Sequence, residues 1–284
     1  MTKNETAAVN FMDLADKINW ELVSSPAKSY LENISSGYKS LKLEDIWSLM
    51  DKAWVECSCV QGAGDGQISL FYDHPVWLLN GLFIEQHELS KRHRRDFAHY
   101  ISSLKPRRVA DFGGGFGSLA RMTGEICPEA EVHVIEPHPQ KTAVALAEKT
   151  ENVRYMPELQ GRYDVLVATD VFEHVTDPLL LVESTAGHLR MNGQFVIANC
   201  FWPVILCHLP GTFHFRWSWA KAMQKMNLIP MAKVAYGRAF KKSGPVSAAG
   251  AREMERRSRS FFGVIECLPS RVRARASNLL WGFL

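Results

Sequence analysis

The stretch VADFGGGFGS, residues 109–118, decides the fold. In it, four glycines follow a short apolar run that holds one carboxylate, Asp111. Because glycine has no side chain, such a loop adopts positive φ angles and lets a ligand touch the backbone directly. In an open α/β sheet, ligands bind outside the carboxyl ends of the strands. The sequence therefore predicts a strand, a ligand-binding loop over residues 113–117, and a helix that begins near Ser118.

Short β-rich runs begin with this stretch and recur after it. They read RRVADFG, AEVHVIEP, NVRYM, YDVLVATD and GQFVIANC, and segments of helical length separate them. Strands that alternate with helices predict βαβ units and a mostly parallel sheet with helices on both faces. We therefore expect an α/β fold with a Rossmann-like core over residues 105–243.

Residues 1–104 carry helical periodicity instead, which predicts a helical N-terminal cap or lid. SKRHRRDFAHYISSL opens on Ser90, a candidate helix N-cap, and KLEDIWSLMDKAWVE repeats apolar residues at helical spacing. TAAVNFMDLADKINWELV does the same, with apolar residues three and four apart. These residues are Val9, Met12, Ala15, Ile18 and Leu22.

Composition limits the class of protein. With 46% hydrophobic and 22% charged residues the chain is typical of globular proteins, and no apolar run approaches the ~20 residues of a membrane helix. MTKNETAAVN lacks a secretory pattern, so we expect a cytoplasmic protein. The six scattered cysteines form no CxxC pair, and we expect neither a disulfide framework nor a metal site.

A basic C-terminal extension, residues 244–284, holds seven Arg and three Glu. It is interpreted as a solvated helix face, and a patch for an acidic partner or a membrane surface is the alternative. No nucleic-acid motif is present, so we expect no nucleic-acid partner. The sequence leaves open whether the chain forms a homodimer.

The glycine loop allows two ligands. Gly115, Gly117 and Ala120 fit the dinucleotide pattern GxGxxA, and Glu136 follows about 20 residues on, where a ribose-binding acid belongs. However, Asp111 precedes the glycines, and a pyrophosphate gains nothing from a neighbouring carboxylate. S-adenosylmethionine carries a cationic sulfonium and a cationic α-amino group, and both can meet carboxylates. The charge pattern therefore favours S-adenosylmethionine.

A second acidic turn follows the fourth predicted strand in YDVLVATDVFEHVTDPLLLVE, with Asp170, Glu173 and His174. Here residues 105–240 resemble the class I S-adenosylmethionine-dependent methyltransferases, most closely the ubiquinone/menaquinone-biosynthesis branch. The resemblance rests on VADFGGGFG, VHVIEP and YDVLVATDVFEHVTDP in this order. It implies that a class I methyltransferase sheet binds S-adenosylmethionine and that the acceptor is a small molecule.

The resemblance also implies site residues. Asp111 would lie near the methionine amino group, Gly113 and Gly115 under the cofactor, and Glu136 at the ribose hydroxyls. Asp170 would face the methionine moiety or the acceptor. The family commonly places an acid after the third strand, at the adenine. NVRYMPELQG offers only Glu158 behind Pro157, so Met156 or Leu159 are alternative adenine contacts.

Candidates for the acceptor side lie outside these motifs. His208 and His214, in the aromatic stretch FWPVILCHLPGTFHFRWSW, are candidate general bases, with structural packing as the alternative. Tyr72 and Trp77, in LFYDHPVWLLNGLF, are candidates to hold a sulfonium by cation–π attraction. We expect residues 70–85 to order over the cofactor, and a permanently packed helix is the alternative. His174 is interpreted as a helix-start or packing residue.

Four functions fit these observations. The first is methyl transfer to the oxygen, nitrogen or carbon of a small metabolite. The second is intramolecular cyclisation of S-adenosylmethionine, as in azetidine-2-carboxylate-forming relatives, with release of methylthioadenosine. The third, a nicotinamide-dependent oxidoreductase, is disfavoured by Asp111. The fourth is a non-catalytic protein that binds S-adenosylmethionine. Likeness of fold does not separate the first two, because function resides in the site.

Overall fold

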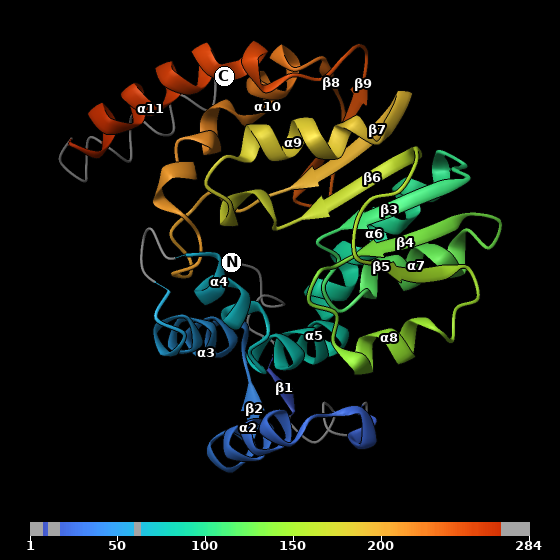
Figure 1. Cartoon of the computed structure of the whole chain (residues 1–284), viewed down its shortest axis with the longest axis vertical. Coiled ribbons are helices and arrows are strands. Elements are labelled where there is room, and N and C mark those ends of the chain that lie inside the picture. Colours follow the sequence, from blue (N-terminus) through green and yellow to red (C-terminus); the bar gives the residue numbers. More distant parts are fainter. Residues whose placement is uncertain (1–7, 11–17, 60–63, 268–284) are drawn as a thin grey trace. The chain divides into compact units, whose positions relative to one another are not determined.

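The chain divides into two compact units in the computed structural model, which describes residues 8–10, 18–59 and 64–267 (Figure 1). The first unit comprises Met1–Leu159 and Ile205–Cys207. The second unit comprises Gln160–Val204 and His208–Leu284. Each unit contributes strands to the Rossmann-like sheet, and each is described separately below.

Three parallel strands form the sheet of the first unit, in the order β5-β4-β3. They are β3 (Arg108–Phe112), β4 (Glu131–Ile135) and β5 (Val153–Met156). Helix α7 (Ser118–Ile126) connects β3 to β4, and α8 (Lys141–Ala147) connects β4 to β5. The predicted βαβ pattern is therefore confirmed, and the glycine loop lies at the carboxyl end of β3.

Helices make up most of the chain before β3, as predicted. Helix α5 contacts α3, α6 and α7, so these helices pack on one another and on the first helix after the glycine loop. The helix bounds are η1 (Trp20–Leu22), α2 (Ser25–Gly37), α3 (Leu43–Glu56), α4 (Asp65–Tyr72), α5 (Val76–Gln86) and α6 (Glu88–Ser103).

Two details of this region differ from the prediction. Val9 belongs to a strand, β1 (Val9–Asn10), because it pairs antiparallel with β2 (Ser40–Leu41) and is buried opposite Leu41. Met12 and Ala15 of the same predicted helix lie outside the described residues. Helix α6 begins at Glu88 instead of Ser90, and the Ser90 hydroxyl hydrogen-bonds to His87 Nδ1 at 2.9 Å.

The second unit contains a parallel pair of strands and an antiparallel hairpin. Strand β6 (Tyr163–Thr169) pairs parallel with β7 (Leu189–Ala198), while β9 (Gly237–Lys242) pairs antiparallel with β7 and with β8 (Leu228–Val234). The sequence did not predict the β8–β9 hairpin. Across the described residues the strand order is β5-β4-β3-β6-β7-β9-β8, and the mostly parallel, Rossmann-like sheet flanked by helices is confirmed.

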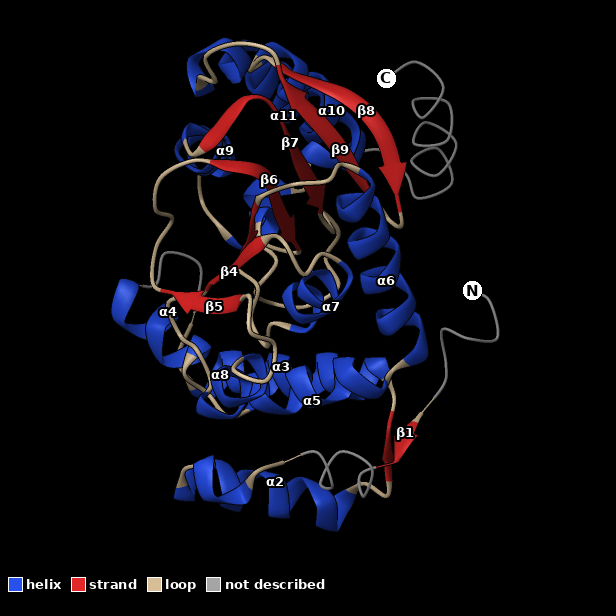
Figure 2. Ribbon diagram, turned by 90° about the vertical axis from the view of Figure 1, so that its right-hand side faces the viewer, coloured by secondary structure: helices blue, strands red, loops and turns tan. Residues whose placement is uncertain are grey.

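Helices of the second unit follow its strands. Helix α9 (Pro178–Gly187) connects β6 to β7, and α10 (Phe215–Lys225) packs against β8 and α11 (Arg252–Glu266) (Figure 2). Asp177 caps α9, because its carboxylate accepts the backbone N–H of Leu180 at 3.0 Å. The short 3-10 turns are η2 (Phe172–His174), η3 (Pro210–Thr212) and η4 (Ala248–Ala251). No helix among the described residues has the length and apolar character to cross a membrane.

A glycine in α5 allows the helix to approach the ligand loop. A Cβ atom on Gly81 would lie 2.5 Å from the ring of Phe116, the residue between the last two loop glycines. Such a contact forces the ring or the helix to move. The close approach of α5 to the loop therefore depends on the absence of a side chain at Gly81.

We expect Gly81→Ala to lower the free energy of unfolding by about 1–3 kcal/mol, the usual cost of overpacking. Urea denaturation measures this change. Gly263→Ala in α11 is the matched control, because nothing lies within 4 Å of its added Cβ. The control should gain about 0.5–1 kcal/mol from the better helix propensity of alanine. Equal effects of the two substitutions would show that the approach of α5 is not tight.

Candidate functional site

The ligand loop has the left-handed backbone that its glycines predict. The φ angles of Gly113, Gly115 and Gly117 are 68°, 51° and 71°, a region that L side chains rarely adopt. A Cβ on Gly114 would lie 2.8 Å from Val134 Cγ1 and 2.9 Å from the Asp111 carboxylate. The loop therefore lies tightly over the ends of β3 and β4, with bare backbone at its surface.

Glu136, at the end of β4, holds this loop in place. Its Oε2 atom accepts the backbone N–H of Gly115 at 3.0 Å, and its Oε1 atom accepts that of His138 at 3.0 Å. Tyr155 on β5 donates its hydroxyl to the carbonyl oxygen of Gly115 at 2.9 Å. Each oxygen of an ionised carboxylate has two lone-pair sites, so Glu136 retains acceptor capacity for two ribose hydroxyls.

Asp111 is a buried acid beneath the loop. Its side chain is only 2% exposed, and its Oδ1 atom has no hydrogen-bond partner among the described residues. Burial raises the pKa of Asp111 to about 7; the charge of Arg94 opposes this rise and the charge of Glu136 adds to it. The carboxylate accepts a backbone hydrogen bond from Ala120, but a buried oxygen without a partner is costly, and a cationic ligand group would reduce that cost.

The segment that the sequence analysis placed over the cofactor contacts the region after β4. The rings of Tyr72 and Trp77 stack with centroids 5.2 Å apart, and the Tyr72 ring stacks on His138 at 6.1 Å. Asp73 Oδ1 lies 2.8 Å from His138 Nδ1. The Tyr72 ring thus stacks on two other rings, and the Trp77 ring stacks on one. Closure of residues 70–85 over a cofactor stays a prediction.

Glu85 joins the end of α5 to the beginning of α7. Its Oε1 atom accepts the hydroxyl of Ser118 and the Arg121 guanidinium, the latter at 2.6 Å. Sequence reasoning missed Glu85, His138 and Tyr155. The position of His138 two residues after Glu136 was the available signal, whereas Glu85 and Tyr155 reach the loop only through the fold.

In the second unit, Asp170 occupies the turn that follows β6. Its φ angle is 56°, its backbone N–H donates to the carbonyl of Ala198 at 2.8 Å, and its Oδ2 atom accepts the Tyr236 hydroxyl at 2.7 Å. The fully buried Glu173 follows, with Oε1 accepting the Cys200 N–H at 2.6 Å. Burial and the neighbouring Asp170 carboxylate raise the pKa of Glu173 well above its ordinary value. Tyr236, on the turn between β8 and β9, was not anticipated.

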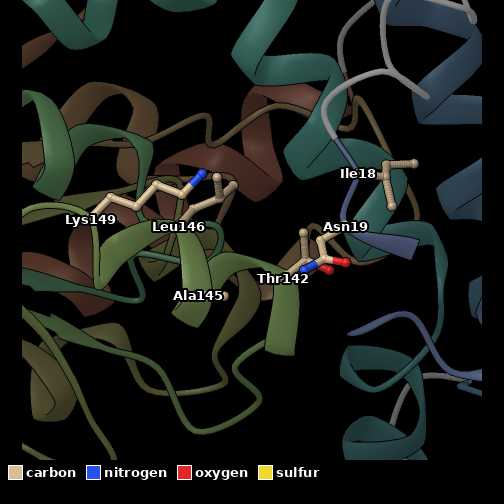
Figure 3. Close-up of a pocket in the computed structure, with 6 residues that line it drawn as sticks. All are labelled: Ile18, Asn19, Thr142, Ala145, Leu146 and Lys149. Atoms are coloured by element: carbon tan, nitrogen blue, oxygen red, sulfur yellow. The ribbon is translucent and has the colours of Figure 1, made fainter. Parts of the chain in front are cut away.

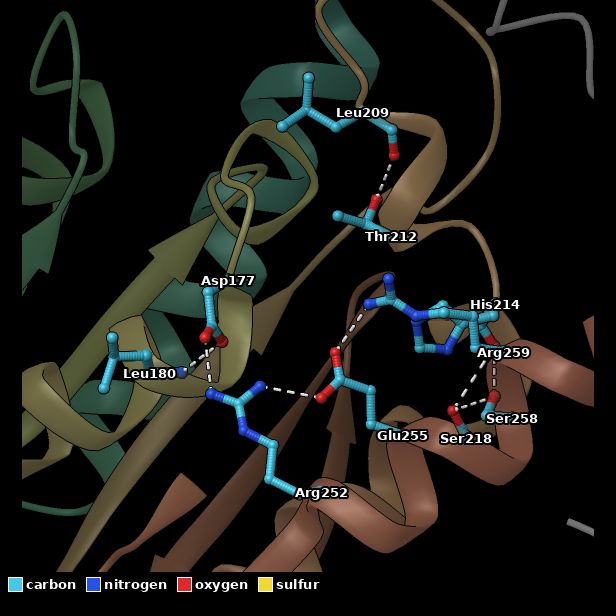
Figure 4. A network of polar contacts seen from close by, with 10 residues as sticks. All are labelled: Asp177, Leu180, Leu209, Thr212, His214, Ser218, Arg252, Glu255, Ser258 and Arg259. Atoms are coloured by element: carbon cyan, nitrogen blue, oxygen red, sulfur yellow. Dashed lines mark hydrogen bonds and ion pairs between the residues drawn. The ribbon is translucent and has the colours of Figure 1, made fainter. Parts of the chain in front are cut away.

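The two candidate bases have different surroundings. His208 is 6% exposed, and its Nδ1 atom lies 2.7 Å from the carbonyl oxygen of Trp202. His214 is 1% exposed and lies beside Ser218, Ser258 and Arg259 (Figure 4). Burial lowers the pKa of His214 to about 4. This deep burial favours the packing alternative for His214, while the basic role of His208 stays a prediction.

A separate pocket of about 250 Å³ lies away from these residues (Figure 3). Its lining comes from Ile18 and Asn19 and from one face of α8 with the residues after it. Drug-sized ligands usually occupy about 300–1,000 Å³. None of the residues predicted to bind the cofactor lines this pocket, so it does not carry the functional assignment. The lining residues are Ile18, Asn19, Thr142, Ala145, Leu146 and Lys149.

Comparison with known protein families identifies the class. The model of the methyltransferase-domain family matches residues 85–244, a span that contains the glycine loop, Glu136 and Asp170. The chain therefore belongs to the methyltransferase-domain family. The family resemblance stated from the sequence is confirmed.

Individual relatives are more distant. A ubiquinone biosynthesis O-methyltransferase of Marinobacter nauticus is 28% identical over 34% of this chain and 45% of the relative. One from Vibrio cholerae is 26% identical over 51% of this chain and 64% of the relative. The chain thus spans less than two thirds of these relatives. The structure of Burkholderia thailandensis 1,6-didemethyltoxoflavin-N1-methyltransferase, with bound S-adenosylhomocysteine, aligns with a TM-score of 0.41 at 18% identity, covering 54% of this chain and 78% of that chain.

We expect Glu136→Ala to weaken binding of S-adenosylhomocysteine by about 1.5–3 kcal/mol, the usual contribution of hydrogen bonds to a charged group. Isothermal titration calorimetry measures the dissociation constant. Glu151→Ala, at an exposed turn of the same unit, is the control and should leave it unchanged. An unchanged constant in folded Glu136→Ala would exclude Glu136 from the cofactor site.

The affinity for S-adenosylhomocysteine should rise with pH up to about 7. Ionised Asp111 attracts the ligand's ammonium group, and the pKa of Asp111 is about 7 in the folded chain. Below that value the affinity should therefore increase by up to about tenfold per pH unit, with a plateau above it. Titrations between about pH 5.5 and 8 test this, and Asp111→Asn should abolish the slope. A slope that persists in the variant would assign the titration to another group.

The raised pKa of Asp111 also affects the stability of the unliganded chain. Here the effect of pH is reversed, because stability falls as the pH rises. The folded state keeps a proton on Asp111 that the unfolded state releases near the ordinary pKa of 3.8. The contribution of Asp111 to the free energy of unfolding therefore falls as the pH rises from about 4 to about 7, and is constant above that range. Urea denaturation of the wild type and of Asp111→Asn separates this contribution.

Proposed function

We propose that the chain is an S-adenosylmethionine-dependent methyltransferase that acts on a small molecule. The observation that carries the proposal is the buried Asp111 carboxylate below a bare-backbone loop within the span matched by the methyltransferase-domain family. A cationic cofactor suits an acid in this place, whereas a pyrophosphate does not. Asp111, Gly113, Gly115 and Glu136 are the proposed cofactor-binding residues.

An oxygen atom is the proposed methyl acceptor. The two curated relatives described above are named as O-methyltransferases. Methyl transfer is an in-line displacement: the acceptor's lone pair bonds to the methyl carbon as the carbon–sulfur bond breaks, and S-adenosylhomocysteine leaves. Alignment of the two reactants supplies about 7–11 kcal/mol of the acceleration.

Asp170 is proposed to face the methionine moiety or the acceptor. The Tyr236 hydroxyl, 2.7 Å from its Oδ2 atom, fixes one carboxylate oxygen. A neutral His208 ring is the proposed proton acceptor for a hydroxyl substrate. Residues 1–104 are proposed as the cap of the site, with Tyr72 and Trp77 as its aromatic surface.

We expect the chain to bind S-adenosylhomocysteine and not NAD, and calorimetric titration with each ligand measures this. On incubation with S-adenosylmethionine alone, chromatography should show no accumulation of methylthioadenosine. Asp111→Asn is the control, because it removes the carboxylate and nearly preserves the side-chain shape. Tight NAD binding would contradict the proposed cofactor. Methylthioadenosine formed by the wild type and not by Asp111→Asn would instead establish the cyclisation reaction.

A further inference from the structure

Three side chains with metal-ligating atoms meet in the second unit. Glu173, His174 and His208 each offer one ligand atom, and these atoms lie within 4.8 Å of one another. The first two belong to the turn after β6, and His208 belongs to the segment after β7. The imidazole rings of the two histidines meet edge to face, with centroids 4.9 Å apart. The fold thus gathers two imidazoles and one carboxylate that the sequence separates.

One carboxylate oxygen of Glu173 accepts a hydrogen bond from the backbone, and by the same geometric criteria the other oxygen accepts none among the described residues. Its Oε1 atom accepts the Cys200 N–H at 2.6 Å, and its Oε2 atom is buried with no hydrogen-bond partner among the described residues. The side chain is fully buried, at 0% exposure. A buried carboxylate normally has a cation or several hydrogen-bond donors as partners. A cation at Oε2 would offset the cost of burying this carboxylate beside the Asp170 carboxylate, which otherwise has to share a proton with it.

His208 is oriented as metal-binding histidines commonly are. Its Nδ1 atom lies 2.7 Å from the carbonyl oxygen of Trp202, and that contact requires a hydrogen on Nδ1. In the neutral ring the hydrogen on Nδ1 leaves Nε2 unprotonated, which is the form in which an imidazole nitrogen binds a metal. The backbone N–H of Leu209 also donates to the carbonyl of Glu173 at 2.8 Å. This hydrogen bond fixes the segment of His208 against the turn of Glu173.

From this arrangement we infer that Glu173, His174 and His208 form a binding site for one divalent first-row transition metal ion. Two imidazole nitrogens and one carboxylate oxygen are a donor set of zinc, manganese and iron sites. Mg²⁺ and Ca²⁺ prefer oxygen ligands throughout. The inference goes beyond the proposed methyl transfer and does not rest on it.

Charge and distance are consistent with such an ion. The Asp170 carboxylate neighbours Glu173 closely enough to raise its pKa, so a charge of +2 would balance the two acids. Donors bound tetrahedrally to one ion at about 2.0–2.2 Å lie about 3.3–3.6 Å apart. Ligand atoms that lie up to 4.8 Å apart must therefore approach by about 1 Å or more on binding, and rotation of the half-buried His174 side chain is the proposed movement. Three protein ligands leave coordination positions for water or for a hydroxyl oxygen, whose pKa the ion would lower. With the ion bound, Nε2 of His208 is a metal ligand and no longer the proton acceptor proposed for the metal-free site.

The test uses the full chain freed of metals with a chelating resin. Calorimetric titration with Zn²⁺, and with Mn²⁺ followed by electron paramagnetic resonance, should show one ion per chain. Glu173→Gln keeps an acceptor for the Cys200 N–H but removes the charge, and His208→Ala removes a ligand. Each should weaken binding at least tenfold. His188→Ala is the matched control, because this half-buried histidine of the same unit lies outside the cluster.

Several outcomes would overturn the inference. One is the lack of saturable binding of either ion, and another is equal affinity in the wild type and in both cluster variants. Equal affinity for Mg²⁺ or Ca²⁺ would exclude the proposed donor set. Circular dichroism shows whether the variants fold, and Glu173→Gln keeps the test valid if His208→Ala does not. S-adenosylhomocysteine titration of the metal-free chain tests the proposed function separately, because its loop belongs to the other unit.

Discussion

The hydrogen bond from the Gly115 N–H to Glu136 is the contact on which the cofactor site depends. It ties the loop after β3 to the end of β4, and the glycines allow the loop to lie close enough for the bond to form. Tyr155 reaches the same glycine from β5, so the loop after β3 is fixed at one residue by groups from β5 and from the end of β4. With the loop held in this way, Asp111 lies covered beneath it.

The sheet and the loop were predictable because they depend on local patterns. Alternation of β-rich and helical runs predicted βαβ units, and DFGGGFG predicted the left-handed loop, since few residues other than glycine adopt it. The strand at Val9 was not predictable, because pairing with Leu41 overrides the helical spacing of its neighbours. Likewise the β8–β9 hairpin is stabilised by pairing with β7, a contact that no local pattern encodes.

Some residues of the candidate site were likewise predictable from the sequence, and others were not. Asp111, Glu136 and Asp170 stand directly after or within strands, so their sequence positions indicate the edge of the sheet at which they lie. Tyr236 and His208 reach Asp170 and Glu173 only after β7 and the following segments have folded back. The sequence spacing of Glu173, His174 and His208 is therefore not typical of metal sites, although their donor atoms are close in space.

Among the described residues, each unit has one buried carboxylate with an oxygen that accepts no hydrogen bond, Asp111 in the first and Glu173 in the second. Burial of each carboxylate costs free energy that its backbone hydrogen bonds offset only in part. Burial raises the pKa of both groups, so the unliganded chain favours their neutral forms. A cation that binds either group restores its charge and recovers the cost of its burial. In the proposed enzyme, the ammonium group of the cofactor binds to Asp111 and a metal ion binds to Glu173. The two proposed ligands thus act on the two buried acids by the same physical effect: each cation favours the ionised form of the carboxylate that it binds.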